Sequence, residues 1–146
     1  MKFYRLLKHF KNVEILGCWS NYTGEFTEVI GHSLLGSIFL RNPNNKEYLV
    51  LHPRMSGNNA KNYGEFDSLV EFEEKILRDV GFKEYCISPF SDEDIDWLEN
   101  SIGKLNQEEC YYPVPDTILG GSGELNTYSK GNVWISADIS GQNRGL

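Results

Sequence analysis

Two short β-rich runs with a turn between them constrain this chain more than any other feature of its sequence. The runs are residues 37–41 and 47–52, and they are joined by Asn42-Pro43-Asn44-Asn45. This is turn chemistry, because proline presets φ and asparagine tolerates the left-handed region. Pro53 ends the second run, since proline cannot donate to a strand ladder and pushes the residue before it into an extended conformation. The sequence therefore predicts a β-hairpin, and with it an antiparallel sheet.

Two helices are predicted by their capping residues. Ser68 and Glu71 form a capping box, and the helix that begins there is expected to end at Gly81. Ser91 begins the next helix and Gly103 ends it. Each helix has one apolar face. The two faces are Leu69, Phe72, Ile76 and Val80, and Ile95, Leu98 and Ile102.

Three further segments are interpreted from their periodicity. Basic residues recur every three positions near the N-terminus with apolar residues between them, which predicts an amphipathic helix with a solvated basic side. The two sets are Lys2, Arg5, Lys8 and Lys11, and Phe3, Leu6, Leu7 and Phe10. Residues 13–16 and 133–139 alternate as strands, and the second of these is expected to join the sheet of the hairpin. Residues 55–64 are expected to form a polar loop.

These elements predict an α+β fold: a single domain over residues 1–146, with a mostly antiparallel sheet, a β-hairpin and about three helices. The chain is 40% hydrophobic and 13% aromatic, which suffices for one packed core. Its three cysteines lack zinc-site spacing, so we expect reduced thiols and neither metal nor cofactor. The absence of a signal-peptide pattern and of long apolar runs predicts a cytoplasmic protein without membrane contact.

The charge of the chain is unevenly distributed. Its net charge of −7 argues against direct binding of DNA or RNA, because phosphates would be repelled. Seven carboxylates lie between Ser91 and Glu109, opposed only by Lys104. They are Asp92, Glu93, Asp94, Asp96, Glu99, Glu108 and Glu109. This acidic segment favours a basic protein as the partner.

Trp97 falls nearly opposite the apolar face of the acidic helix, beside Glu93 and Asn100. An outward tryptophan in such a helix is a candidate binding hot spot. The alternative is that Trp97 packs beneath the following loop, since tryptophan is highly buried on average.

No catalytic signature occurs in the chain, which predicts that it is not an enzyme. Residues 120–123 are glycine-rich but lack the lysine and the Ser/Thr of a phosphate-binding P-loop. Residues 31–36 do not have the spacing of a serine nucleophile elbow. His9, His32 and His52 lack a metal-binding motif, and the adjacent Glu108 and Glu109 point in different directions.

Two blocks of sequence resemble a known family. The first runs from Gly103-Lys104-Leu105 through Glu109-Cys110-Tyr111 and Val114-Pro115 to Leu119-Gly120-Gly121. The second comprises residues 33–40, the turn 42–45 and residues 48–51. Together they resemble the C-terminal domain of immunity proteins that protect bacteria against type VI secretion DNase toxins. The resemblance covers residues of about 28–139.

The resemblance implies an immunity protein that binds and neutralises a cognate secreted toxin, expected to be a basic nuclease, by occluding its active site or substrate-binding surface. The acidic segment then supplies the candidate partner-binding residues, which are Glu93, Asp96, Trp97, Asn100, Glu108 and Glu109. Two alternatives stay open. One is a small-ligand-binding regulatory module that uses residues 120–123 with Tyr111, Tyr112 and Tyr128. The other is an enzyme in which His32 or His52 meets two carboxylates in a pocket.

Overall fold

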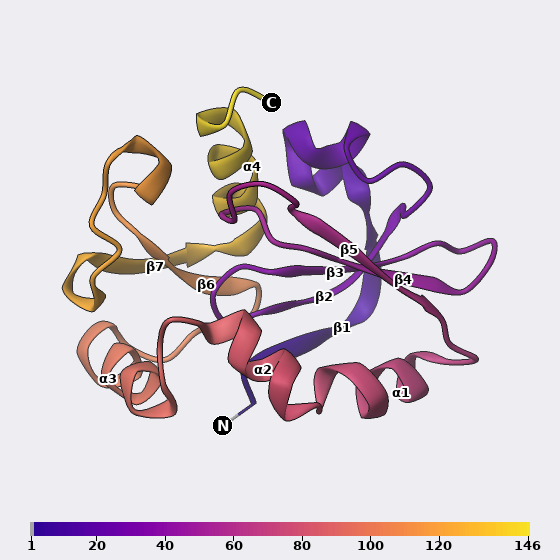
Figure 1. The fold of residues 1–146 in the computed structure, drawn as a ribbon, viewed down its shortest axis with the longest axis horizontal. Helices are drawn as coiled ribbons and strands as arrows, with labels where there is room; N and C mark the ends of the chain where they lie inside the picture. Colours follow the sequence, from indigo (N-terminus) through magenta and orange to yellow (C-terminus); the bar gives the residue numbers. More distant parts are fainter. Residues whose placement is uncertain (1) are drawn as a thin grey trace.

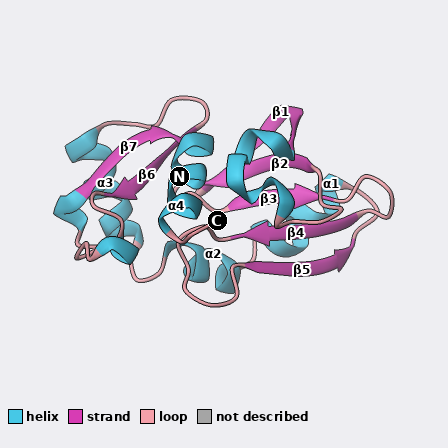
Figure 2. Cartoon of the chain, turned by 90° about the horizontal axis from the view of Figure 1, so that it is seen from above, coloured by secondary structure: helices cyan, strands magenta, loops and turns pink. Residues whose placement is uncertain are grey.

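Seven strands form two antiparallel sheets in the computed structural model, which describes residues 2–146. The larger sheet has five strands in the order β1-β2-β3-β4-β5, so strands that are consecutive in the chain are neighbours in the sheet. A second sheet pairs β6 with β7 and lies beside the first (Figures 1 and 2). The strands are β1 Tyr4–Asn12, β2 Glu28–Ser33, β3 Ile38–Arg41, β4 Glu47–Leu51, β5 Ala60–Glu65, β6 Glu109–Pro113 and β7 Tyr128–Asn132.

Helices cover both faces of the larger sheet. In Figure 1, α1 and α2 lie below it and α4 lies above it. The helical segments are η1 Val13–Asn21, α1 Leu69–Phe72, η2 Glu73–Leu77, α2 Val80–Ile87, α3 Asp92–Ile102, η3 Thr117–Leu119, η4 Leu125–Thr127 and α4 Val133–Asn143. The predicted α+β class is confirmed, with more helical segments than expected. Within residues 2–146, no helix combines the length and the apolar character needed to cross a membrane.

Successive side chains of the central strands enter two different cores. Phe39 packs with Phe72 of α1 on one face of the sheet. Leu40, the next residue of β3, packs on the other face with Leu16 of η1 and Trp134 of α4. Because both faces are buried, the central strands are apolar at almost every position.

The predicted hairpin is confirmed. β3 and β4 pair antiparallel with Ile38 opposite Leu51. In the turn, the Asn42 side chain accepts a hydrogen bond from the Asn44 backbone N–H at 2.9 Å. Lys46 supplies a φ of +61° where the chain enters β4.

Both predicted helix starts are confirmed as well. The Ser68 hydroxyl accepts from the Glu71 N–H at 3.2 Å. Ser91 and Asp94 form a reciprocal capping box, with hydrogen bonds of 3.3 and 2.9 Å. Helix α3 ends before Gly103, whose φ of +110° disfavours residues with a side chain.

The first of these helices is shorter than predicted. The chain widens into a π-helical segment after Phe72, and Asp79 begins a new helix by accepting from the Phe82 N–H at 3.0 Å. Gly81 therefore lies inside α2 and does not end a helix, and Val80 is exposed. The prediction was wrong because a second capping residue interrupts the apolar periodicity.

The predicted N-terminal helix is strand β1. It pairs with β2 from Tyr4, opposite Ser33, to Asn12, opposite Glu28. The register shifts between Leu6 and Lys11, so residues on either side of this irregularity change faces. The spacing of three between basic residues, which has the period of a helix, therefore did not identify this edge strand.

Two shorter segments also differ from prediction. Residues 13–16, expected to be a strand, begin η1, because the Asn12 side chain caps this segment by accepting from the Glu14 N–H at 2.9 Å. Residues 55–64, expected to be a loop, include the first residues of β5, the edge strand beside β4. Few apolar residues mark β5, since its burial is partial.

The predicted last strand is helix α4. The Asn132 side chain caps it by accepting from the N–H groups of Trp134 and Ile135 at 2.9 and 3.0 Å. The apolar residues that alternate in the sequence therefore lie on two different faces of the helix. Val133 and Ala137, four residues apart, are buried, whereas Ile135 and Ile139 are exposed.

Helix α4 packs so closely on η1 that Gly141 has no room for a side chain. A Cβ at this position would lie 2.4 Å from the Cys18 Sγ and 2.7 Å from the Trp19 Nε1. We predict that Gly141→Ala lowers the free energy of unfolding by about 1–3 kcal/mol, although the same change in an open helix is stabilising. Urea denaturation measures it, with Gln142→Ala as the exposed control, expected to stay within about 0.5 kcal/mol of the native chain. A stabilised Gly141→Ala variant would contradict the packing of α4 on η1.

Candidate functional site

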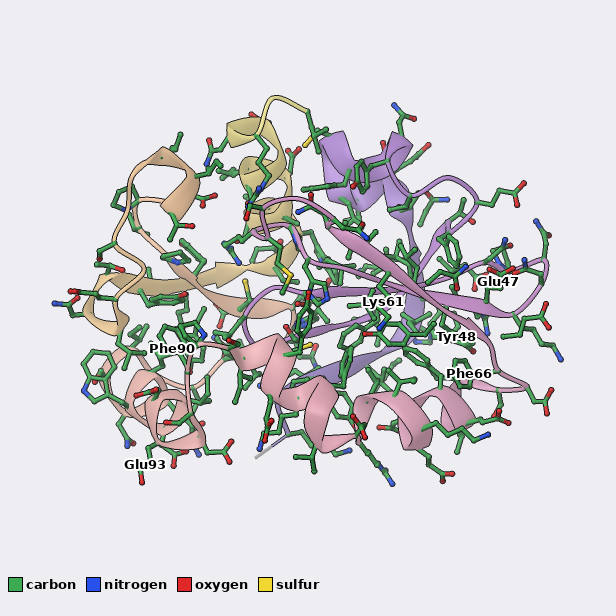
Figure 3. The ribbon with its side chains drawn as sticks, in the orientation of Figure 1. Glu47, Tyr48, Lys61, Phe66, Phe90 and Glu93 are labelled. Carbon is green, nitrogen blue, oxygen red and sulfur yellow. The ribbon has the colours of Figure 1, made fainter. Side chains whose placement is uncertain are left out.

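Four of the predicted partner-binding residues lie on the exposed face of α3. Glu93, Asp96, Trp97 and Asn100 are all exposed, and Figure 3 shows Glu93 pointing away from the body of the molecule. The opposite face of α3 carries Ile95 and Leu98, which are buried in the core. We call these four residues the α3 face.

Trp97 differs from the other two tryptophans in its exposure. Its side chain is 42% exposed, against 1% for Trp19 and 3% for Trp134. Trp19 and Trp134 donate their ring N–H groups to the Ala137 carbonyl and the Glu108 carboxylate. The structure thus places Trp97 in the outward orientation that the helical periodicity indicated, not beneath the following loop.

The α3 face holds the carboxylates of this helix that are free of internal partners. Asp92 pairs with Lys83 at 2.7 Å, and Glu99 pairs with Lys104 at 3.9 Å. Asp94 is engaged in the capping box. Within the described chain, Glu93 and Asp96 form no ion pair at 4.0 Å or less.

Glu108 and Glu109 have internal roles and do not extend the α3 face. The Glu108 carboxylate accepts from the Trp134 ring N–H at 2.6 Å and pairs with Lys11 at 3.4 Å. The hydrogen bond from Trp134 is the main reason why the pKa of Glu108 is lowered. Glu109 pairs with Lys130 at 3.7 Å and accepts from the Asn106 N–H at 2.7 Å.

An apolar groove lies between α4 and the segment 112–119, and sequence reasoning missed it. Four aliphatic side chains that line it are 51–61% exposed. They are Val114, Leu119, Ile135 and Ile139. The groove encloses about 350 Å³ and reaches down to Arg54. Its α4 wall was hidden because residues 133–139 were interpreted as a strand; the capping residue Asn132 was the signal that could have revealed it.

A second concavity, which we call the His52 cavity, lies between the segments that flank the start of β3 and the end of β4, helix α2 and the segment 117–123. It encloses about 370 Å³. The Ser37 hydroxyl and the His52 Nδ1 lie 2.8 Å apart at its edge. Burial lowers the pKa of His52 to about 4 and raises that of the neighbouring Cys86 thiol to about 12. Both side chains are therefore neutral at pH 7.

The His52 cavity contains part of the ligand site that the glycine-rich segment suggested. Ser122, Gly123 and Tyr128 line it. Tyr111 does not, because it is buried in the core and donates its hydroxyl to the Gly103 carbonyl at 2.7 Å. Tyr112 lines the apolar groove.

The two buried histidines lack the partners expected of a catalytic site. His52 bonds to Ser37, and the His32 Nδ1 bonds to the Ser33 carbonyl at 2.9 Å. Neither imidazole has a carboxylate at hydrogen-bonding distance within the described residues. No group of three or more His, Cys, Asp or Glu side chains suited to a metal ion occurs in residues 2–146.

The residues that carry the family resemblance have structural roles. The Tyr111 N–H donates to the Leu34 carbonyl at 2.8 Å, which joins the two blocks directly. Gly120 adopts the left-handed conformation that ends η3, with a φ of +93°. A Cβ on Gly121 would lie 2.0 Å from the Pro115 carbonyl oxygen, so this turn requires glycine. The second block forms parts of β2 and the β3–β4 hairpin.

Comparison with known proteins identifies a related fold. No family model matches the chain, and no curated protein matches it. Among solved structures, it is similar to the crystal structure of Atu4351 from Agrobacterium tumefaciens, with a TM-score of 0.69 and 14% sequence identity. The match covers 97% of this chain and 67% of that one, and it establishes a shared fold.

The low pKa of His52 predicts an acid-sensitive fold. Because His52 stays neutral in the folded state down to about pH 4, but takes up a proton near pH 6.5 when unfolded, stability is lost as the pH falls through this window. His52 alone should remove about 3 kcal/mol of unfolding free energy between pH 7 and pH 4. Urea denaturation at several pH values measures this loss. His52→Gln should show a shallower decline over the same window, and an equal slope in both proteins would refute the assignment.

Proposed function

We propose that this chain is an immunity protein that acts in the cytoplasm, where it binds a cognate toxin delivered by a secretion system and blocks that toxin's active site or substrate-binding surface. The observation that carries the proposal is the α3 face, where an exposed tryptophan lies among acidic residues without internal partners. Tryptophan is among the residues enriched at binding hot spots. The family resemblance supports the same function.

The charge of the α3 face favours a nuclease as the target. A nuclease binds a polyanion and is therefore basic where it works. Glu93 and Asp96 are free to face such a surface, since internal cations neutralise most of the neighbouring carboxylates. Complementary charge also accelerates encounter, which matters to a cell that must capture a toxin before it acts.

The apolar groove offers a second area on which the toxin can be held. Its exposed aliphatic side chains form a cluster. Single apolar residues on a surface are common, but exposed apolar clusters mark interaction sites. One wall, segment 112–119, belongs to the block that resembles the immunity family. Burial of these side chains against the toxin would add affinity to the complex. The exposed charges of α3 add less, because salt screens them.

Affinity capture tests the function directly. The tagged chain is recovered from cells that express the toxin locus, and its partner is identified by mass and assayed for toxicity with and without this chain. We expect one toxin domain whose killing this chain abolishes. Recovery of no stable protein partner would refute the proposal and would favour a small-ligand-binding module.

The placement of the interface has its own test. Reversing both free carboxylates, with Glu93→Lys and Asp96→Lys, should slow association with the captured toxin by about tenfold at low salt and leave the fold intact. The matched control is Glu74→Lys with Glu84→Lys, two exposed carboxylates on η2 and α2 whose reversal changes the net charge equally. Equal association rates for the two double variants would show that the interface does not include α3. The proposed function would not be affected by that outcome.

A further inference from the structure

A groove along strand β1 gathers positive charge. It encloses about 550 Å³ and lies between β1, Glu73 of η2 and residues 107–108. We call it the β1 groove. Its basic lining residues are Lys2, Arg5, Lys8, His9 and Lys11.

Two carboxylates, Glu73 and Glu108, offset part of this charge. Glu73 lies 4.0 Å from the Lys2 ammonium, and Glu108 lies 3.4 Å from that of Lys11. Both carboxylates also accept hydrogen bonds from aromatic side chains of the core. They therefore neutralise the two lysines at the ends of the groove and leave the cations between them unpaired.

Arg5 and Lys8 are those unpaired cations. Within residues 2–146, neither has a carboxylate within 4.0 Å. The Arg5 guanidinium donates to the carbonyls of Leu105 and Asn106 at 2.8 and 2.7 Å, which hold it at the groove without neutralising it. Lys8 is exposed. The groove is therefore positive in a chain whose net charge is −7, and it attracts an anion.

Strand β1 also has backbone groups to offer, because it lies at one end of the sheet (Figure 2). Residues 7–10 lie where its register shifts, opposite Ile30 of β2 alone. One residue cannot pair with all of their N–H and C=O groups. Outside the ladder with β2, residues 7–10 make no backbone–backbone hydrogen bond in the part of the chain that the structure describes. An edge of this kind can accept a further strand.

The charge of β1 restricts which strand can be added. Lysines on an edge strand disfavour pairing with a second copy of the same edge, because like charges would face each other. An acidic strand meets no such repulsion. The β1 groove thus combines the two features that an acidic peptide requires, unpaired cations and free backbone groups.

A nucleic-acid strand is less suited to the β1 groove than an acidic peptide. Single-stranded nucleic acids are held by accessible aromatic rings on which their bases stack. Tyr4, the one phenylalanine, tyrosine or tryptophan among the described residues that line the groove, is buried. The ring of the neighbouring Phe10 is covered by the Arg41 guanidinium, 4.8 Å from its centroid.

We propose that the β1 groove binds an extended acidic segment of a partner protein. The segment adds to the sheet at residues 7–10 and places its carboxylates against Arg5 and Lys8. This surface is separate from the α3 face and goes beyond the proposed function. Its test does not depend on the toxin.

The probe is an acetylated and amidated hexapeptide in which glutamate alternates with threonine, so that its carboxylates share one side of a strand. In an NMR titration of the native chain, the amides of residues 7–10 should shift saturably. A peptide with glutamine for glutamate should bind at least about tenfold more weakly, because it lacks the charge. A glutamate peptide methylated at every backbone nitrogen should also bind at least about tenfold more weakly, because it cannot donate to β1.

Four outcomes would overturn the proposal. Equal affinity of the glutamine peptide would exclude the charge, and equal affinity of the methylated peptide would exclude strand addition. Tighter binding of a thymidylate hexamer than of the glutamate peptide would favour nucleic acid as the occupant. No saturable shift of the amides of residues 7–10 at about 10 mM glutamate peptide would exclude the site.

Two lysine variants locate the charge. Lys8→Glu should weaken binding of the glutamate peptide by about tenfold. Lys61→Glu makes the same exchange at an exposed lysine of β5, the opposite edge strand, and should leave the affinity within about twofold. If Lys8→Glu does not fold, Lys8→Gln removes the charge alone and should weaken binding by about threefold. Unchanged affinity in a folded Lys8 variant would overturn the placement of the peptide on β1.

Discussion

Burial of both faces of the five-stranded sheet is the constraint on which the rest of this structure depends. β3 and β4 turn large apolar side chains to both sides, and a sheet of this kind is stable only when both faces are covered. The segment from α1 to α2 covers one face, and η1 with α4 covers the other. Helix α3 joins the first of these cores through Ile95 and Leu98. The apolar groove has α4 as one wall, and α2 lines part of the His52 cavity.

Sequence reasoning succeeded where a few adjacent residues determine the structure. The turn at Asn42 and the caps at Ser68 and Ser91 depend on hydrogen bonds between residues two or three apart, so they can be predicted from the sequence. Sequence reasoning failed where contacts between residues far apart in the chain determine the secondary structure. β1 is a strand because β2 pairs with it, although the spacing of three between its basic residues predicted a helix. α4 is a helix that buries Val133 and Ala137 against η1, although alternation predicted a strand.

The candidate sites divide in the same way. Glu93, Asp96, Trp97 and Asn100 share one exposed face because they belong to a single well-capped helix, which makes their arrangement predictable. Glu108 and Glu109 were grouped with them by sequence proximity, yet Trp134, Lys11 and Lys130 hold their carboxylates elsewhere. The His52 cavity brings together segments as distant as residues 37 and 128, so no local pattern could reveal it.

The late position of α4 in the chain has a consequence for biosynthesis. The face of the sheet that carries Ile38, Leu40 and Leu51 is completed by Val133, Trp134 and Ala137. These strands leave the ribosome before residues 133–143 are made, so the part of this surface that α4 covers stays open until then. An apolar surface that is open in a nascent chain is prone to aggregation, and completion of this core must follow the synthesis of α4.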